Sequence, residues 1–201
     1  MKTIIFDFGS VIFNIDYSAL YSKYFPSKKE FTYFRTQILT AEIRSSFNYG
    51  LALPKLEELA KKHPEYQTEI MATFHEYEKI LAGVIPGMEE LLQELSARGV
   101  AIYGLTNWSA DNYVKLEHKY PNILAYMDGI TVSGQEGIKK PDPNFFKILL
   151  DKYNIDPATA VFVDDKLANV ETANSLGMDG VVFTSADKLI SHLNSKYDLS
   201  I

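Results

Sequence analysis

A few side chains of this sequence could carry chemistry, and they follow apolar runs that are well separated along the chain. They are Asp7, Thr106-Asn107, Lys140 and Asp164-Asp165. Carboxylates gathered in one place repel one another unless a cation lies among them, and oxygen ligands of this kind suit Mg²⁺. Lys140 and Thr106 could then bind the remaining oxygens of a phosphate. A carboxylate beside Mg²⁺ and a phosphate can act as an in-line nucleophile and form an aspartyl phosphate.

The apolar runs themselves are typical of buried parallel strands, because they are short and rich in β-branched and aromatic residues. The expected strands cover residues 3–6, 100–105, 129–132, 160–163 and 180–183. Helical patterns lie between them: over 88–95 with a stop at Gly99, from Asp142-Pro143 onward, and over about 167–176. Strands that alternate with helices predict a doubly wound, Rossmann-like α/β sheet. Ligands of such sheets bind at the carboxyl ends of the strands, where these polar residues are expected.

The segment from residue 16 to residue 83 has a different pattern. Its apolar residues recur at helical spacing, for example at Tyr17, Leu20 and Tyr21, and we find no strand pattern in it. We therefore expect a small helical insertion after the first strand, over residues 16–83, within a core formed by residues 1–15 and 84–201.

Length and composition exclude several classes of protein. The 201 residues suffice for one substantial domain with a smaller insertion, and 46% of them are hydrophobic, so global disorder is excluded. With 20 basic and 26 acidic residues the net charge is −6, which argues against a nucleic-acid partner. There is no cysteine and no apolar run of membrane-spanning length, so we expect a cytoplasmic protein without a membrane partner.

Four motifs in order resemble those of the haloacid dehalogenase (HAD) superfamily. They are Ile4-Ile5-Phe6-Asp7-Phe8-Gly9-Ser10-Val11, Gly104-Leu105-Thr106-Asn107, Gly137-Ile138-Lys139-Lys140-Pro141-Asp142-Pro143 and Val161-Phe162-Val163-Asp164-Asp165. The helical insertion resembles the small cap of these enzymes. The resemblance implies a Mg²⁺-dependent phosphatase that acts on a small phosphorylated metabolite.

The resemblance also implies roles for individual residues. Asp7 is the expected nucleophile, and Lys140 neutralises charge and orients it. The expected metal ligands are Asp7, the backbone carbonyl of Gly9, Asp164 and Asp165, of which Asp165 is favoured as a direct ligand. The expected phosphate- and substrate-binding residues are Gly9, Ser10, Thr106, Asn107 through its backbone, and Trp108.

Gly9 is a departure from the family pattern, since most phosphatases of the superfamily have a second Asp there as general acid/base. Acid/base help is worth about 10²–10⁴-fold in rate, so its loss would slow such an enzyme without abolishing it. The Gly9 pattern resembles a branch that includes an α-glucose-1-phosphate phosphatase. An anomeric oxygen leaves readily and needs the acid less, which favours a sugar phosphate as substrate.

Two other functions stay open at this point. A metal-free 2-haloacid dehalogenase uses the same nucleophile, but such enzymes usually have Tyr at the position of Gly9 and lack the paired Asp164-Asp165. A weakly catalytic or non-catalytic protein that binds phosphorylated ligands or a partner is the second alternative.

The insertion offers candidates for specificity that the sequence does not rank. Arg35, Arg44 and Lys55 could bind a second anionic group, and His75 could replace the missing acid. Trp108 could line the pocket or pack between cap and core. The protein is expected to be a monomer or a homodimer.

Overall fold

A five-stranded parallel sheet forms the centre of the protein in the computed structural model, which describes residues 2–200. The strand order is β5-β4-β1-β6-β7, and every neighbouring pair is parallel. The strands are β1 (Thr3–Phe6), β4 (Ala101–Thr106), β5 (Gly129–Val132), β6 (Ala160–Asp164) and β7 (Asp179–Val182). The doubly wound parallel sheet predicted from the sequence is confirmed.

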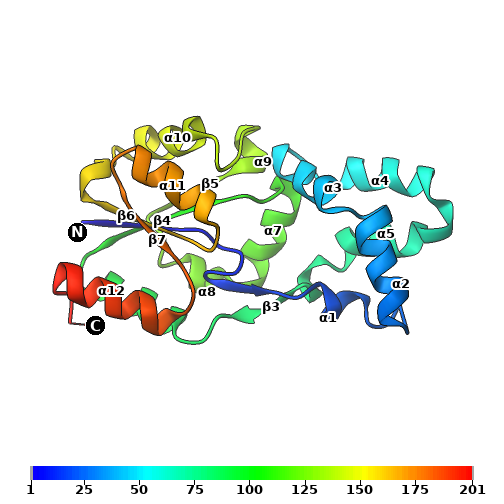
Figure 1. The fold of residues 1–201 in the computed structure, drawn as a ribbon, viewed down its shortest axis with the longest axis horizontal. Helices are drawn as coiled ribbons and strands as arrows, with labels where there is room; N and C mark the ends of the chain where they lie inside the picture. The colour runs from blue at the N-terminus through cyan, green and yellow to red at the C-terminus, as the bar shows by residue number, and fades with distance from the viewer. Residues whose placement is uncertain (1, 201) are drawn as a thin grey trace.

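Helices cover both faces of this sheet. Figure 1 shows α10 (Pro143–Tyr153) and α11 (Leu167–Ser175) on one side, and α8 (Pro121–Leu124) and α12 (Ala186–Tyr197) on the other. The remaining elements of this part are α6 (Met88–Ala97), α7 (Ala110–Lys119), α9 (Ser133–Glu136) and the 3₁₀ turn η5 (Pro157–Thr159). Asp142 caps α10, since its carboxylate accepts a hydrogen bond from the Asn144 N–H at 2.9 Å.

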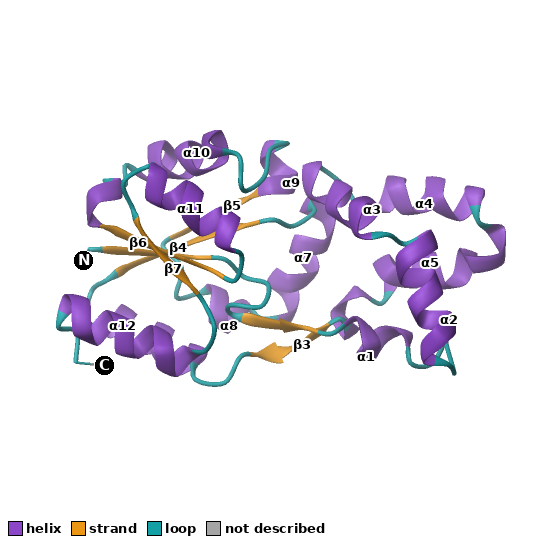
Figure 2. Cartoon of the chain, viewed as in Figure 1, coloured by secondary structure: helices purple, strands orange, loops and turns teal. Residues whose placement is uncertain are grey.

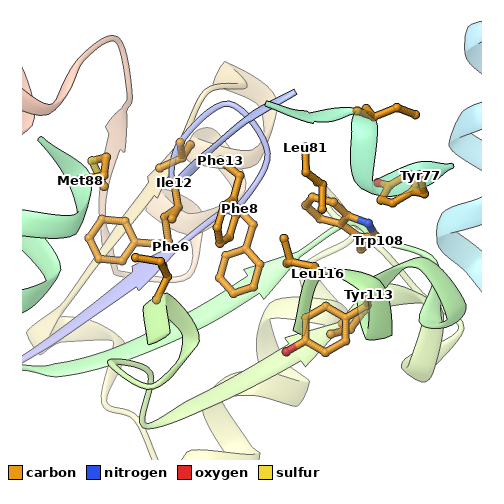
Figure 3. Close-up of a cluster of buried hydrophobic side chains, with 14 of the residues drawn as sticks. Phe6, Phe8, Ile12, Phe13, Tyr77, Leu81, Met88, Trp108, Tyr113 and Leu116 are labelled. Atoms are coloured by element: carbon orange, nitrogen blue, oxygen red, sulfur yellow. The ribbon is translucent and has the colours of Figure 1, made fainter. Parts of the chain in front are cut away.

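Two hydrophobic clusters lie on opposite faces of the sheet. Ile5 belongs to the cluster that packs against Phe146 of α10, whereas Ile4 and Phe6 belong to the larger one. This alternation follows from the two-residue period of a strand, and it requires apolar residues at every position of β1. Figure 3 shows part of the larger cluster, which continues from Phe6 toward Trp108 and Tyr77.

A second, two-stranded antiparallel sheet links the parallel sheet to the inserted segment. It pairs β2 (Phe13–Ile15) with β3 (Leu81–Val84). The expectation of no strand between residues 16 and 83 was therefore wrong at its end, because β3 begins at Leu81. The strand is four residues long and contains Gly83 at φ +117°, so it has no alternating pattern, and its partner lies far away in sequence.

Short helices form the rest of the inserted segment, which we call the helical region (residues 17–79). They are α1 (Tyr17–Tyr21), α2 (Lys28–Tyr33), the π-helix η1 (Phe34–Ile38), α3 (Ala41–Ser46), η2 (Phe47–Tyr49), α4 (Leu53–Lys62), η3 (Pro64–Tyr66), α5 (Gln67–His75) and η4 (Tyr77–Lys79). Figure 2 shows this region at the end of the molecule opposite both termini. Its centre is aromatic: the rings of Tyr21 and Phe25 lie 5.2 and 5.0 Å from that of Phe34.

Polar contacts hold the helical region over the sheet. The Asp111 carboxylate on α7 accepts hydrogen bonds from the N–H groups of Ala52 (2.9 Å) and Leu53 (2.8 Å), and so caps α4 from the other part of the molecule. Lys139 donates to the carbonyl of Ser45 at 3.2 Å. None of the helices within residues 2–200 is long and apolar enough to span a bilayer.

Candidate active site

The carboxyl ends of three neighbouring strands bring the expected site residues together. Asp7 follows β1, Thr106 ends β4 and Asp164 ends β6. Phe6 pairs with both Gly104 and Val163 in the sheet, so Asp7 and Asp164 come one residue and Thr106 two residues beyond this register, at one edge. All three side chains are buried. Burying a polar group costs free energy unless the protein or a ligand supplies a hydrogen-bond partner.

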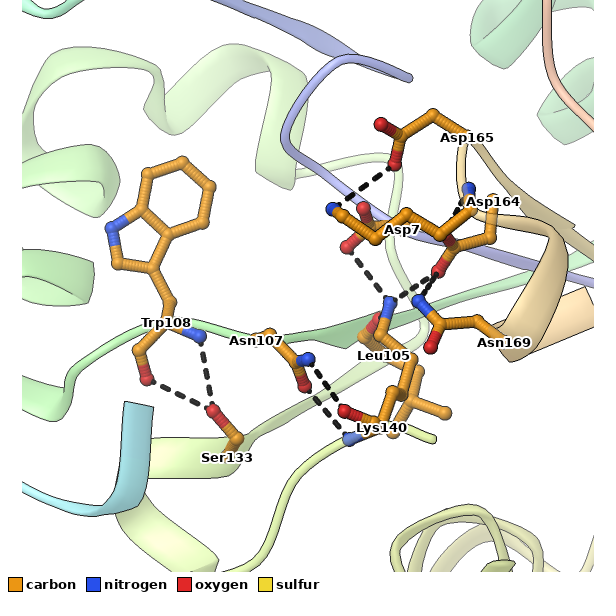
Figure 4. A network of polar contacts seen from close by, with 10 residues as sticks. Asp7, Leu105, Asn107, Trp108, Ser133, Lys140, Asp164, Asp165 and Asn169 are labelled. Carbon is orange, nitrogen blue, oxygen red and sulfur yellow. Dashed lines mark hydrogen bonds and ion pairs between the residues drawn. The ribbon is translucent and has the colours of Figure 1, made fainter. Parts of the chain in front are cut away.

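Lys140 lies at the centre of this group. Its Nζ is 2.8 Å from a carboxylate oxygen of Asp7 and 2.8 Å from one of Asp164, and it also donates to the Leu105 carbonyl at 2.6 Å (Figure 4). The residue is only 2% exposed, and these three bonds use all the donors of an ammonium group. Burial raises the pKa of the Asp7 carboxyl, while the Lys140 charge opposes this shift.

Asn107 positions Lys140 through the backbone. The Asn107 Nδ2 donates to the Lys140 carbonyl at 3.0 Å, and the Lys140 N–H donates to the Asn107 Oδ1 at 2.9 Å (Figure 4). The Oγ of Ser133 accepts a hydrogen bond from the Trp108 N–H at 3.0 Å, which fixes the next residue of the same loop. The sequence suggested a role for the Asn107 backbone only. The two hydrogen bonds between the Asn107 side chain and the Lys140 backbone, which we call the Asn107 clamp, form between residues far apart in sequence, so no local pattern indicates them.

Thr106 has an unused hydroxyl at the end of β4. Its side chain is 1% exposed, and its Oγ1 has no hydrogen-bond partner within residues 2–200. A buried hydroxyl without a partner costs free energy, and at the edge of a cleft a ligand oxygen can satisfy it.

Asp7, Asp164 and Asp165 form a carboxylate cluster in which donor oxygens of the three lie within 4.8 Å of one another. Asp164 is the most engaged of them: its oxygens accept hydrogen bonds from Lys140, from the Asn169 Nδ2 at 2.9 Å and from the Lys166 N–H at 2.9 Å. Asp165 is more exposed and has an ion pair with Lys166 at 3.4 Å. Three carboxylates at this spacing fit a hard divalent cation with oxygen ligands.

A cleft of about 630 Å³ lies over these residues, between the sheet edge and the helical region. Among the expected site residues, its walls include Asp7, Gly9, Ser10, Thr106, Asn107, Trp108 and Lys140. Asp164 and Asp165 adjoin it through the carboxylate cluster.

The sequence left open whether Trp108 lines the pocket or packs between cap and core, and it does both. It lines the cleft, and its ring lies 6.1 Å from that of Tyr77 of the helical region in an edge-on arrangement. Gly9 lies beside it. A Cβ at Gly9 would be 3.9 Å from Trp108 and 3.6 Å from Ile15, which is ordinary contact, so the glycine is not required by space.

The structure corrects other sequence expectations at the cleft. His75 is exposed and does not line the cleft, so it is not placed to replace the missing acid. Lys139, to which the sequence analysis gave no role, lines the cleft and contacts Ser45. Lys166 also lines it and was not singled out, although its place directly after Asp165 could have indicated it. Asn169 holds the Asp164 carboxylate in place through a hydrogen bond from its Nδ2.

Comparison with known proteins decides the family. The family model described as haloacid dehalogenase-like hydrolase matches residues 1–177. The chain belongs to this family.

Two curated relatives are named as a phosphatase and a hydrolase. A sesquiterpene phosphatase of Aspergillus oryzae is 32% identical over 92% of this chain and 91% of the relative. A flavin mononucleotide hydrolase of Arabidopsis thaliana is 34% identical over 55% of this chain, and the match spans 44% of that relative.

A solved structure has the same fold over nearly the whole chain. A magnesium complex of a HAD family enzyme from Bacteroides thetaiotaomicron superimposes with a TM-score of 0.74 at 21% identity, over 98% of this chain and 99% of the other. At this identity the likeness concerns the fold of the whole chain, including the helical region.

Proposed function

We propose that the protein is a Mg²⁺-dependent phosphatase that hydrolyses a small phosphorylated metabolite through an aspartyl phosphate on Asp7. The observation that carries this proposal is the buried group of Asp7, Lys140 and Asp164 beside the unpartnered Thr106 hydroxyl. The curated names support it, since the two relatives are named for different small phosphorylated substrates.

Asp7 is the nucleophile in this proposal. One of its oxygens forms a bond to phosphorus while the bond from phosphorus to the leaving oxygen breaks, and the leaving oxygen takes a proton from water. Water then cleaves the aspartyl phosphate and releases inorganic phosphate. Lys140 holds the Asp7 carboxylate in place and offsets its charge, and Thr106 donates its free hydroxyl to a phosphate oxygen.

The metal ligands would be Asp7, the Gly9 carbonyl, Asp164 and Asp165. Asp165 is favoured as a direct ligand because both oxygens of Asp164 already accept protein hydrogen bonds. When bound, Mg²⁺ supplies positive charge that polarises the oxygens of the transferring phosphate.

In this proposal residues 16–83, which contain the helical region, are the cap, and residues 1–15 and 84–201 are the catalytic core. Ser10, Asn107 and Trp108 would contact the substrate from the core side of the cleft. A cap over the cleft excludes water and bulky substrates. A cytoplasmic location, inferred from the cysteine-free sequence, belongs to the same proposal.

Gly9 favours a substrate with a good leaving group. Ile15 and Trp108 border the place where an acid would lie, so the site as built has an apolar wall there. A sugar 1-phosphate fits this arrangement, because its anomeric oxygen needs less help from an acid than an ordinary alkoxide does. Hydrolysis of serine phosphate as fast as that of a hexose 1-phosphate would contradict this part of the proposal.

The test is hydrolysis of p-nitrophenyl phosphate, with Mg²⁺ and with EDTA. Its leaving group hardly needs protonation by an acid, so the lack of an acid at Gly9 should not limit the rate with this substrate. We expect turnover with Mg²⁺ that EDTA abolishes and that Asp7→Asn lowers by at least about 10³-fold. Asp151→Asn, an exposed aspartate on α10, is the matched control and should keep wild-type activity.

Absence of turnover with Mg²⁺ would overturn the phosphatase. Chloride release from 2-chloropropionate would then separate the remaining alternatives: release that depends on Asp7 indicates a dehalogenase, and none indicates a protein that binds without catalysis.

A further inference from the structure

Two arginines of the helical region face the same cleft as Asp7. Arg35 lies in the π-helix η1 and Arg44 in α3, and both line the cleft of about 630 Å³. Both also line an adjoining outer cavity of about 450 Å³. Lys55, the third cation considered from the sequence, donates instead to the Ser46 carbonyl and does not line the cleft.

Neither arginine has an acidic partner. No carboxylate within residues 2–200 lies in ion-pair distance of either guanidinium. The Nε of Arg35 is buried and, among the described residues, has no hydrogen-bond partner. Arg44 donates through Nη1 to the carbonyls of Leu39 and Arg35.

The two positive charges also lie close together. Both guanidiniums lie over the ring of Tyr17, with centres 4.2 Å (Arg35) and 5.6 Å (Arg44) from the ring centroid. Burial and the neighbouring charge of Arg35 lower the pKa of Arg44. The contact with one aromatic ring offsets only part of the repulsion between two cations, which an anion would remove.

The backbone around Arg35 is unusual. Residues Phe34–Ile38 form a π-helix, a rare form that occurs often at functional sites. The sheet side of the cleft has the unpartnered Thr106 hydroxyl beside the positive charge of Lys140, and the helical side has this arginine pair, so one cavity contains two places for an anion.

We propose that Arg35 and Arg44 bind a second oxyanion of the substrate, a phosphate or a carboxylate, while its first phosphate lies against Asp7. This inference rests on the proposed function and narrows its substrate class to small molecules with two anionic groups. Arginine is suited to this role because its planar donors match both carboxylate and phosphate oxygens.

The experiment compares substrates that differ by one anion. Three pairs vary the spacing and the type of the second group: hexyl phosphate with hexyl diphosphate, glycerol 3-phosphate with 3-phosphoglycerate, and α-glucose 1-phosphate with glucose 1,6-bisphosphate. Steady-state hydrolysis of each is measured with Mg²⁺ for the wild type, Arg35→Gln, Arg44→Gln and the control Lys61→Gln. Lys61 is an exposed cation of α4 outside both cavities.

We expect the wild type to favour the two-anion member of at least one pair by tenfold or more in kcat/KM. Arg35→Gln should remove most of this preference, chiefly by raising KM, since the contact is remote from the reacting atoms. Lys61→Gln should retain it. Arg44→Gln should have a similar effect, but Arg35 is the cleaner probe because Arg44 also binds two backbone carbonyls.

Two results would overturn the inference while the proposed function stands: no preference for the second anion in any pair, or an equal loss for both members in Arg35→Gln, which indicates a structural role. If no compound is hydrolysed, the proposed function fails instead. Calorimetric titration of the wild type and Arg35→Gln with the same pairs then decides: tighter binding of two-anion compounds that requires Arg35 supports the inference, and equal binding of both members overturns it.

Discussion

The sheet edge and the helical region present charge to the cleft in opposite ways. At the sheet edge, Lys140 uses all its donors on buried protein oxygens, and Asp164 accepts hydrogen bonds on both of its oxygens. In the helical region, Arg35 has a buried nitrogen without a partner within residues 2–200. The charged groups of the sheet edge are thus fixed before a ligand arrives, whereas the helical region keeps a charged donor free.

This difference suggests how one fold can hold its reacting groups rigidly while the groups that bind different substrates vary. Groups that take part in bond breaking gain from being held rigidly by strands and by their own hydrogen bonds. Groups that select the substrate can lie on separate short helices, where their replacement does not disturb the sheet. Four predictions test whether the two regions divide the work in this way.

The largest effect is expected from breaking the paired charges of the sheet edge with Lys140→Met. The change leaves Asp7 and Asp164 buried without a counter-charge, which should cost about 3–5 kcal/mol of stability. Urea unfolding with and without Mg²⁺ measures this cost, and Mg²⁺ should reduce it because a cation again lies among the carboxylates. Lys147→Met, at an exposed position of α10, is the control. Equal stability of Lys140→Met and the wild type would contradict the central role of Lys140.

A gain of activity is expected from Gly9→Asp. The added Cβ fits beside Ile15 and Trp108, and apolar surroundings favour the protonated form of a carboxyl, which is the form that donates a proton. Hydrolysis of a substrate with an alkoxide leaving group should rise by about tenfold or more. The rate with p-nitrophenyl phosphate should change little by comparison. A fall in both rates would show that the site does not accept an acid at this position.

A smaller effect is expected from loosening the link between the two regions with Asp111→Ala. The change removes the acceptor of the Ala52 and Leu53 N–H groups, and loss of a helix cap costs about 1 kcal/mol. Hydrogen exchange at the start of α4 should become faster, while exchange in β1 should not. Unchanged exchange at α4 would mean that this contact does not hold the helical region in place.

The smallest effect is expected from acid acting on a surface contact inside the helical region. Hydrogen bonds from Lys23, Lys79 and Tyr24 lower the pKa of Glu76 from 4.5 to about 2. A lowered folded-state pKa contributes stability above pH 4.5, and this contribution is lost as the pH falls from 4.5 through 2.

Urea unfolding at pH 5 and pH 3 tests this loss. The wild type should lose slightly more stability between these values than Glu76→Gln, and Glu57→Gln, an exposed control on α4, should behave like the wild type. An equal loss in the wild type and Glu76→Gln would show that solvent screens this cluster completely.

The sequence predicted the sheet and the meeting of Asp7, Thr106 and Asp164 because short apolar runs and the polar residues that end them are local signals. Parallel strands then place those ends at one edge, whatever the loops between them do. The Asn107 clamp on Lys140 and the Asp111 cap on α4 had no such signal, since each joins residues more than 30 positions apart.

The helical region was harder to predict from the sequence for the same reason. Helical spacing indicated its class, but not which face of each short helix meets the cleft. Arg35, Arg44 and Lys55 were equivalent in sequence, and only the packing of η1 and α3 over the sheet edge turned the first two toward Asp7. Strand β3 was not predicted because it pairs with β2, which lies on the other side of the inserted segment in the sequence.

The β2–β3 ribbon has a mechanical consequence. The chain enters the helical region through β2 and returns through β3, so both covalent connections run side by side in one narrow antiparallel ribbon (Figure 2). A rotation about this ribbon would have to break the contacts of Asp111 and Lys139 with the helical region, and it would change the span between the arginines and Asp7. A ligand that bridges this span would therefore add to those contacts, and part of its binding free energy would oppose the rotation.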